Sequence, residues 1–197
     1  MNAGIEPCSL CKKETFAFDR VIACWTYEGR VCDAIVAAKY AQQSPLGKAL
    51  GRRLGMRVAT ATASDPPDQI TYVPSNFRRQ LSRGGRNGNV AIAHAVSDSL
   101  ANAGLKVPVR ALLRTTRGIK KQAWLNEQQR RENVRGAFAA KKSYACLRTS
   151  RLAKSHILLV DDVLTTGATS NEIARVLRQA GAHQVTLAVV ARAVWSK

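Results

Sequence analysis

The chain has 197 residues, enough for one α/β domain with a substantial core, and hydrophobic residues make up 46% of it. The formal net charge is +18, from 31 Lys and Arg against 13 Asp and Glu. No apolar run is long enough for a membrane span, and the first eight residues lack a secretory signal pattern. We therefore expect a cytoplasmic protein without a membrane span.

The positive charge is concentrated in the middle of the chain. Residues 69–160 contain 18 basic and 3 acidic residues, which is +15 of the total. A field of this kind attracts polyphosphates or nucleic acid. A charged surface that only keeps the protein soluble would give the same count, so both interpretations stay open.

The first third of the chain predicts one strand and two helices. Residues 21–26 form a short apolar run that is typical of a buried strand. Residues 31–38 and 46–58 carry apolar side chains at helical spacing. Residues 59–69 are small and polar and include two prolines, so we expect a loop there.

From residue 70 onward, short apolar strands alternate with amphipathic helices. This alternation indicates an α/β fold with a mainly parallel sheet covered by helices on both faces. Such sheets bind ligands at the carboxyl ends of their strands. The expected strands are residues 70–73, 107–113, 156–160 and 185–191, and the expected helices are 89–103 and 170–180.

The most informative segment is residues 157–169, Ile-Leu-Leu-Val-Asp-Asp-Val-Leu-Thr-Thr-Gly-Ala-Thr. Its last five residues can direct backbone N–H groups and hydroxyls at one phosphate, next to the positive end of the helix that follows. Gly167 allows the backbone to approach closely. Asp161 and Asp162 would repel a phosphate, but they suit the two vicinal hydroxyls of a ribose. Together these features describe a site for a ribose 5-phosphate.

A structural alternative is that the two acids only end a strand and the threonines only cap a helix. Repulsion between adjacent carboxylates makes that arrangement costly. A dinucleotide-binding domain is excluded because GxGxxG is absent, and a Walker loop because GKS and GKT are absent.

Residues 157–169 resemble, over their whole length, the phosphoribosyl-pyrophosphate (PRPP) signature of the type I phosphoribosyltransferases. The resemblance implies a type I phosphoribosyltransferase-like fold, and it implies that Asp161 and Asp162 hold the ribose 2′ and 3′ hydroxyls during catalysis. It also implies Mg²⁺, which would arrive with PRPP. The implied 5-phosphate ligands are Thr165, Thr166, Gly167, Ala168 and Thr169.

Further motifs are similar to the competence-protein-F (ComF) branch of that superfamily, so that the resemblance is nearly full length. These motifs are residues 27–29, 39–40, 117–125 and 130–138. In the resembled family the turn after the strand at residues 70–73 is a pyrophosphate loop, although Pro74 could simply end that strand. The implied pyrophosphate ligands are Pro74, Ser75, Asn76, Arg78, Arg79 and Arg83. The implied flexible loop that closes over PRPP and excludes water contains Lys120, Lys121 and Gln122.

Five cysteines in a cytoplasmic setting argue against a disulfide framework. Cys8 and Cys11 match the second pair of a four-cysteine zinc knuckle that is common in the resembled family. Cys24 and Cys32 could complete a tetrahedral zinc site, but both lie in predicted core elements, and we favour buried thiols. We expect residues 1–20 to be a remnant of the knuckle and residues 21–197 to be the phosphoribosyltransferase-like domain.

Two compatible functions follow. One is an enzyme that transfers the ribose 5-phosphate of PRPP to a nitrogen nucleophile. The other is a non-catalytic module that binds single-stranded DNA, which the ComF resemblance links to DNA uptake with a helicase-like and a DNA-loading partner. A third, weaker interpretation is a PRPP-responsive regulator. We predict a PRPP-binding protein of the ComF type linked to competence, and leave transferase activity open.

Overall fold

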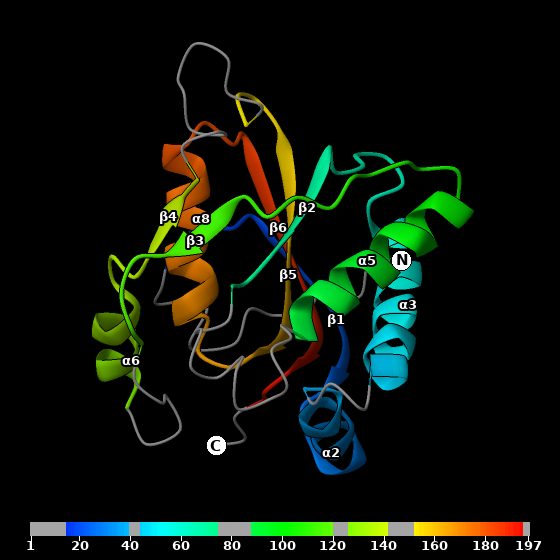
Figure 1. Ribbon diagram of the computed structural model, residues 1–197, viewed down its shortest axis with the longest axis horizontal. Helices are drawn as coiled ribbons and strands as arrows, with labels where there is room; N and C mark the ends of the chain where they lie inside the picture. Colours follow the sequence, from blue (N-terminus) through cyan, green and yellow to red (C-terminus); the bar gives the residue numbers. More distant parts are fainter. Residues whose placement is uncertain (1–14, 40–43, 75–87, 120–125, 142–151, 195–197) are drawn as a thin grey trace.

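The structure is a computed structural model that describes residues 15–39, 44–74, 88–119, 126–141 and 152–194. Its centre is a four-stranded sheet with the order β1-β6-β5-β2, in which every neighbouring pair is parallel (Figure 1). The strands of this sheet are β1 (Arg20–Thr26), β2 (Gln69–Tyr72), β5 (His156–Leu164) and β6 (Gln184–Arg192).

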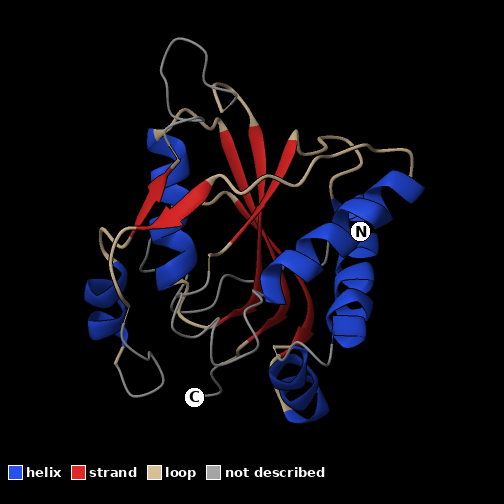
Figure 2. Cartoon of the chain, in the orientation of Figure 1, coloured by secondary structure: helices blue, strands red, loops and turns tan. Residues whose placement is uncertain are grey.

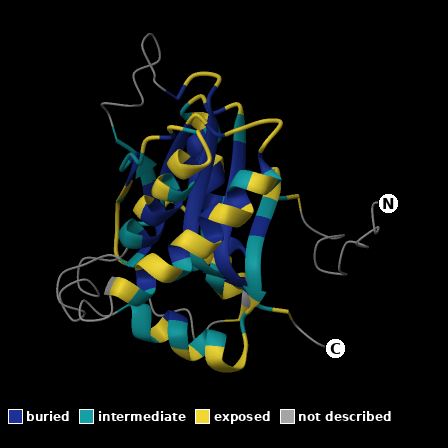
Figure 3. Ribbon diagram, turned by 90° about the vertical axis from the view of Figure 1, so that its right-hand side faces the viewer, coloured by how far each residue is buried: buried dark blue, intermediate teal, exposed yellow. Residues whose placement is uncertain are grey.

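Helices cover both faces of the sheet (Figure 2). One face carries α2 (Gly29–Ala38), α3 (Ser44–Ala61) and α5 (Gly88–Asn102), and the other carries α8 (Ala168–Gln179). Because successive side chains of a strand point to opposite faces, the apolar run in β5 contributes side chains to the hydrophobic core on each face of the sheet. Leu158 and Val160 pack toward α3 and α5, whereas Ile157 and Leu159 pack toward α8. Figure 3 shows these buried strands between helices whose outer faces are exposed.

A small antiparallel sheet lies beyond α8. It pairs β3 (Leu113–Thr115) with β4 (Phe138–Ala140), and α6 (Glu127–Val134) lies between them in the chain. Helix α6 begins with a capping box, in which the Asn126 side chain accepts from Gln129 N at 2.9 Å and Gln129 Oε1 accepts from Asn126 N at 3.0 Å. Phe138 and Val134 join the core on the α8 side, so the small sheet is part of the same domain.

The predicted parallel sheet with helices on both faces is confirmed, but two strand predictions are wrong in extent. The expected strand over residues 107–113 makes only one isolated bridge, between Val109 and Ile70. Pro108 lacks an N–H group and cannot donate to a ladder, which limits the pairing to this bridge. Strand β5 was expected to end at Val160, but it continues to Leu164 because Asp161, Val163 and Leu164 still pair with β6.

Among the described residues, no helix combines the length and apolar character that a bilayer crossing needs.

Candidate functional site

The carboxylates of the predicted motif lie inside β5, near its carboxyl end. Asp161 is 9% exposed and Asp162 is half-buried. The sequence predicted that they follow the strand, whereas both precede the last two strand residues, Val163 and Leu164. The adjacent strand β2 ends close by, since Val73 N donates to Val160 O at 3.0 Å. The two acids therefore sit at the carboxyl edge of the sheet, where α/β proteins bind ligands.

Asn89 fixes the buried acid. Its Nδ2 donates to Asp161 Oδ1 at 3.0 Å and lies 3.3 Å from Val73 O, so one amide links the start of α5 to the ends of β5 and β2. Asp161 Oδ1 also accepts from Asp162 N at 2.9 Å. Asn89 is not among the site residues that the sequence predicted. A signal was present, because Asn89 lies four residues before Ala93 and so continues the buried face of α5.

The environment of Asp161 disfavours its charged form. Burial raises the pKa of Asp161 to about 7, and the negative charge of Asp162 acts in the same direction. Hydrogen bonds from Asp162 N and Asn89 and the charge of Lys39 lower this pKa in part. A buried carboxyl group that titrates near neutral pH is typical of a functional site.

Lys39 pairs with the second acid. Its Nζ lies 2.6 Å from Asp162 Oδ2, and the two side chains are 27% and 22% exposed. Lys39 directly follows α2. Tyr27 belongs to the same neighbourhood: a hydrogen bond with Cys32 raises the pKa of Tyr27 to about 12, with smaller contributions from burial and from the charge of Asp162. Residues that follow β1, β2 and α2 thus converge on the end of β5.

The turn from β5 into α8 has the form that the phosphate-binding prediction requires. Gly167 precedes α8 with a φ of 79°, a left-handed conformation that favours glycine. Its carbonyl accepts from Asn171 N at 2.8 Å, and Ala168 N lies 3.4 Å from Thr166 Oγ1. No acidic side chain lies in the first turn of α8, which the structure describes throughout. No side chain of this turn therefore opposes an anion at the positive end of the helix dipole.

Glu172 attaches the small sheet to this helix. Its Oε1 accepts from Gly136 N at 2.8 Å, at the turn before β4. The same carboxylate pairs with Arg175, one turn further along α8, at 2.7 Å. Helix α8 thus connects the turn at residues 165–169, at its amino end, with the segment that contains β3, α6 and β4.

The comparison with known protein families decides what kind of domain this is. Residues 86–194, more than half of the chain, match the phosphoribosyl transferase domain. The chain belongs to the phosphoribosyl transferase domain family. The predicted type I phosphoribosyltransferase-like fold and the family resemblance are therefore confirmed.

Curated relatives of this phosphoribosyl transferase domain protein extend the similarity over most of the chain. Competence protein F of Haemophilus influenzae is 27% identical over 190 residues, covering 94% of this chain and 78% of the relative. DNA utilization protein YhgH of Escherichia coli K12 is 28% identical over 188 residues, covering 91% of this chain and 74% of the relative. The predicted similarity to competence protein F is confirmed.

A solved structure, glutamine phosphoribosylpyrophosphate amidotransferase from B. subtilis, aligns with a TM-score of 0.46 at 21% identity. The alignment covers 73% of this chain and 26% of that chain, so the chain spans about a quarter of the length of the amidotransferase.

The structure describes only some of the predicted site residues. It describes the acid pair and residues 165–169, which lie in one continuous segment of the phosphoribosyl transferase domain. Pro74 is described and half-buried, directly after Val73. Cys24 and Cys32 are free, half-buried thiols. The predicted residues that lie outside the described ranges are Cys8, Cys11, Ser75, Asn76, Arg78, Arg79, Arg83, Lys120, Lys121 and Gln122.

Proposed function

We propose that this protein binds PRPP, with the ribose 5-phosphate moiety at the carboxyl end of β5. The observation that carries the proposal is the continuity of the segment from Asp161 to Ala168. It supplies a carboxylate pair, a glycine turn with a φ of 79° and a helix amino terminus at one edge of the sheet. Asn89 and Lys39 hold the two carboxylates at this edge.

Each part of the segment has a defined role in this proposal. The carboxylates of Asp161 and Asp162 accept hydrogen bonds from the ribose 2′ and 3′ hydroxyls. The backbone N–H groups and hydroxyls of residues 165–169 donate to the 5-phosphate, since the first N–H groups of a helix have no acceptor within the helix. Pro74 begins the turn that we assign to the pyrophosphate.

The residues at the site fit a magnesium ion that PRPP itself holds. The described residues contain no group of three or more side chains arranged as metal ligands, and Asp162 already pairs with Lys39. Mg²⁺ is commonly bound through one or two carboxylates and substrate phosphates, so PRPP oxygens would supply most of its ligands. When bound, the ion would neutralise the charge of the pyrophosphate.

The reaction that such a complex supports is displacement of pyrophosphate from C1 of the ribose by a nitrogen nucleophile. The new bond forms between nitrogen and C1, and the C1–oxygen bond to pyrophosphate breaks with its electron pair. The protein contributes positioning of the ribose and stabilisation of charge, without a covalent intermediate on the chain.

Isothermal titration calorimetry with Mg-PRPP tests the proposal. We expect the Asp161→Asn/Asp162→Asn variant to bind at least about a hundredfold more weakly than the wild type, because the hydroxyl acceptors lose their charge. The matched control is Asp98→Asn, which removes an exposed carboxylate from α5. Equal affinity of the wild type and the double variant, or no binding by the wild type, would overturn the proposal.

A second candidate function, binding of single-stranded nucleic acid, is favoured by a basic groove between β1 and α3. The groove has a volume of about 520 Å³ and is lined by Arg20, Arg53 and Arg57, and the described residues that line it include no carboxylate. Two guanidinium groups are oriented by carbonyls: Arg20 Nη1 donates to Ala61 O at 2.6 Å, and Arg57 Nη2 lies 3.5 Å from Ala23 O.

This groove suits a single strand because it combines cations with apolar surface. Met56, which is 58% exposed, lies in the lining beside the arginines and offers an apolar surface to a base. The arginines can neutralise phosphates of a nucleic-acid backbone. The names of the relatives, competence protein F and DNA utilization protein, agree with such a ligand. A role in DNA uptake would require a helicase-like and a DNA-loading partner.

The salt dependence of oligonucleotide binding tests this second function. For single strands, each neutralised phosphate contributes about 0.7 to the slope of log K against log salt. Arg53→Gln/Arg57→Gln removes two such contacts and should therefore make the fall of log K with log salt shallower by about 1.4. Lys48→Gln/Arg52→Gln removes the same charge at the same spacing from α3, outside the groove, and should leave the slope unchanged. An equal loss in both variants would assign binding to net charge and not to the groove.

A further inference from the structure

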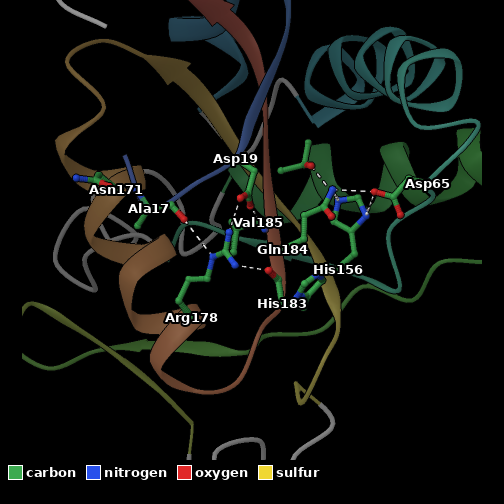
Figure 4. A network of polar contacts seen from close by, with 10 residues as sticks. Ala17, Asp19, Asp65, His156, Asn171, Arg178, His183, Gln184 and Val185 are labelled. Atoms are coloured by element: carbon green, nitrogen blue, oxygen red, sulfur yellow. Dashed lines mark hydrogen bonds and ion pairs between the residues drawn. The ribbon is translucent and has the colours of Figure 1, made fainter. Parts of the chain in front are cut away.

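Four residues that precede β1 lie along α8, and we call residues 16–19 the strap (Figure 4). Ala17 is its central contact. Ala17 N donates to Asn171 Oδ1 at 2.7 Å, and Ala17 O accepts from Arg178 Nε at 3.3 Å. Asn171 and Arg178 are seven residues apart, which is about two helical turns, so both side chains lie on one face of α8. Both backbone polar groups of Ala17 are thus held by the helix that begins at residues 165–169, which we call the phosphate loop.

The other end of the strap is attached to the start of β6. Asp19 N donates to Val185 O at 2.9 Å, and Val185 N donates to Asp19 Oδ2 at 2.8 Å. Arg178 also pairs with the carboxylate of Asp19. Arg178, in the last turn of α8, therefore holds the strap at two points, and the strap cannot move along the helix without breaking these contacts.

The first residue of the strap contacts the phosphate loop itself. A Cβ atom added to Gly167 would lie 3.0 Å from Phe16 Cε1, so the aromatic ring packs against the backbone of Gly167. The Phe16 ring stacks on Phe18, with ring centroids 4.8 Å apart. The carbonyl of Gly167 is held by Asn171 N, and the Asn171 side chain holds Ala17. The ring and the first turn of α8 therefore both fix the residue at which the loop turns.

We propose that Phe16 is a positioning residue for the phosphate loop and that docking of the strap preorganises the loop for the 5-phosphate. The inference rests on the proposed function of the β5–α8 segment. A loop that is held in its bound conformation loses less conformational freedom when a ligand binds. By linkage, the bound phosphate in turn favours the docked strap.

Affinity for ribose 5-phosphate, measured by calorimetry, tests the role of Phe16. Phe16→Ala should weaken binding by about tenfold, and Phe16→Leu should restore most of the affinity because a large apolar side chain again covers Gly167. The matched control is Leu105→Ala, which truncates a half-buried apolar side chain in the turn after α5, in the core on the other face of the sheet, and should change the affinity less than about twofold. The affinity of Phe16→Ala for Mg-pyrophosphate should equal that of the wild type.

The outcomes separate this inference from the function on which it rests. Unchanged affinity of Phe16→Ala for ribose 5-phosphate, in a wild type that binds it, would overturn the positioning role alone. Equal losses in Phe16→Ala and Leu105→Ala would also overturn it, because they would reflect general destabilisation. No binding by the wild type would remove the proposed function and this inference with it.

Hydrogen exchange gives a second readout, which does not require a variant that folds poorly. Saturating ribose 5-phosphate should slow exchange of the Ala17 amide in the wild-type protein, since that N–H is donated to Asn171 in the docked strap. Amides in the second half of α5 should be unaffected. Ala17 exchange that is independent of the ligand would contradict the coupling.

Discussion

The two ends of β5 each bury a polar side chain, but the surroundings of the two side chains differ. At the amino end, His156 is 6% exposed, and its backbone N donates to Asp68 Oδ2 at 2.7 Å. Its ring Nε2 lies 2.8 Å from Thr186 Oγ1, and Nδ1 lies 3.5 Å from the carboxylate of Asp65. Gln184 Nε2 also donates to Asp65, at 2.8 Å, as part of the network in Figure 4. These contacts join the loop before β2 to the first residues of β5 and β6.

At the carboxyl end, the same strand buries a carboxyl group whose ionisation is opposed by its surroundings. Asp161 is 9% exposed, and burial raises its pKa to about 7. The amino end thus uses polar groups to fix the strands, while the carboxyl end buries an ionisable group whose charged form costs stability. Proteins tolerate such conflicts mainly where a ligand is bound.

The largest expected effect is a loss of ligand affinity on substitution of Gly167. Gly104, which also has a positive φ, serves as the comparison. Gly167→Ala should weaken binding of ribose 5-phosphate at least about thirtyfold, because the added Cβ would meet Phe16 at 3.0 Å in a loop that already requires a left-handed residue. Gly104→Ala, in the turn after α5, meets no atom of the described residues within 4 Å and carries the same strain at a φ of 86°. It should lower the melting temperature without changing the affinity. Equal affinities of the two variants for ribose 5-phosphate would contradict the specific role of Gly167.

The pH dependence of PRPP binding is the next largest effect. If the ionised form of Asp161 accepts the ribose hydroxyls, the affinity should fall about tenfold per pH unit as the pH drops below about 7. Lys39→Met should shift this fall in affinity to higher pH, because the charge of Lys39 lowers the pKa of Asp161. Calorimetry between pH 5.5 and about 8.5 measures both. An affinity for PRPP that does not change across this range would contradict the assigned role.

At the amino end, we expect a change in stability alone. Asp68→Ala removes the acceptor of His156 N, and the loss of a hydrogen bond to a charged group costs about 1.5–3 kcal/mol. The melting temperature should fall by several degrees, while the affinity for Mg-PRPP stays within about twofold of the wild type. A large loss of affinity would show that the two ends are coupled.

The smallest effect is a gain of stability at the carboxyl end. The folded-state pKa of Asp161 is raised above its ordinary value of 3.8, so its favourable contribution is present below pH 3.8 and is lost as the pH rises through about 7. Asp161→Asn removes this loss and should melt higher than the wild type at pH 8, with a smaller difference at pH 5. Asp98→Asn serves as the control. A lower melting temperature for Asp161→Asn than for the wild type at pH 8 would contradict the claim that the buried Asp161 carboxylate destabilises the fold.

The sequence predicted the parts of this protein that depend on local patterns. The apolar run before Asp161 and the helical spacing after Gly167 were sufficient to predict β5, α8 and the glycine turn between them. The strand at residues 107–113 was overestimated because the apolar pattern was given more weight than the missing N–H group of Pro108. The β3 and β4 strands, with three residues each, are too short to show a period of two.

Contacts between distant segments could not be predicted in this way. Asn89 and Asp161 are 72 residues apart, and no local pattern in either segment indicates their hydrogen bond. Lys39 was noted only as part of a family motif, without a partner. The contact of Phe16 with Gly167 links a residue before the first strand to the start of α8. Only tertiary structure brings these pairs together.

A crystal structure of the protein soaked with ribose 5-phosphate tests the central claim most directly. We predict the phosphate within hydrogen-bonding distance of backbone N–H groups in residues 165–169, with the 2′ and 3′ hydroxyls on the carboxylates of Asp161 and Asp162. A phosphate bound elsewhere on the molecule, or a ribose that makes no contact with either carboxylate, would contradict the account.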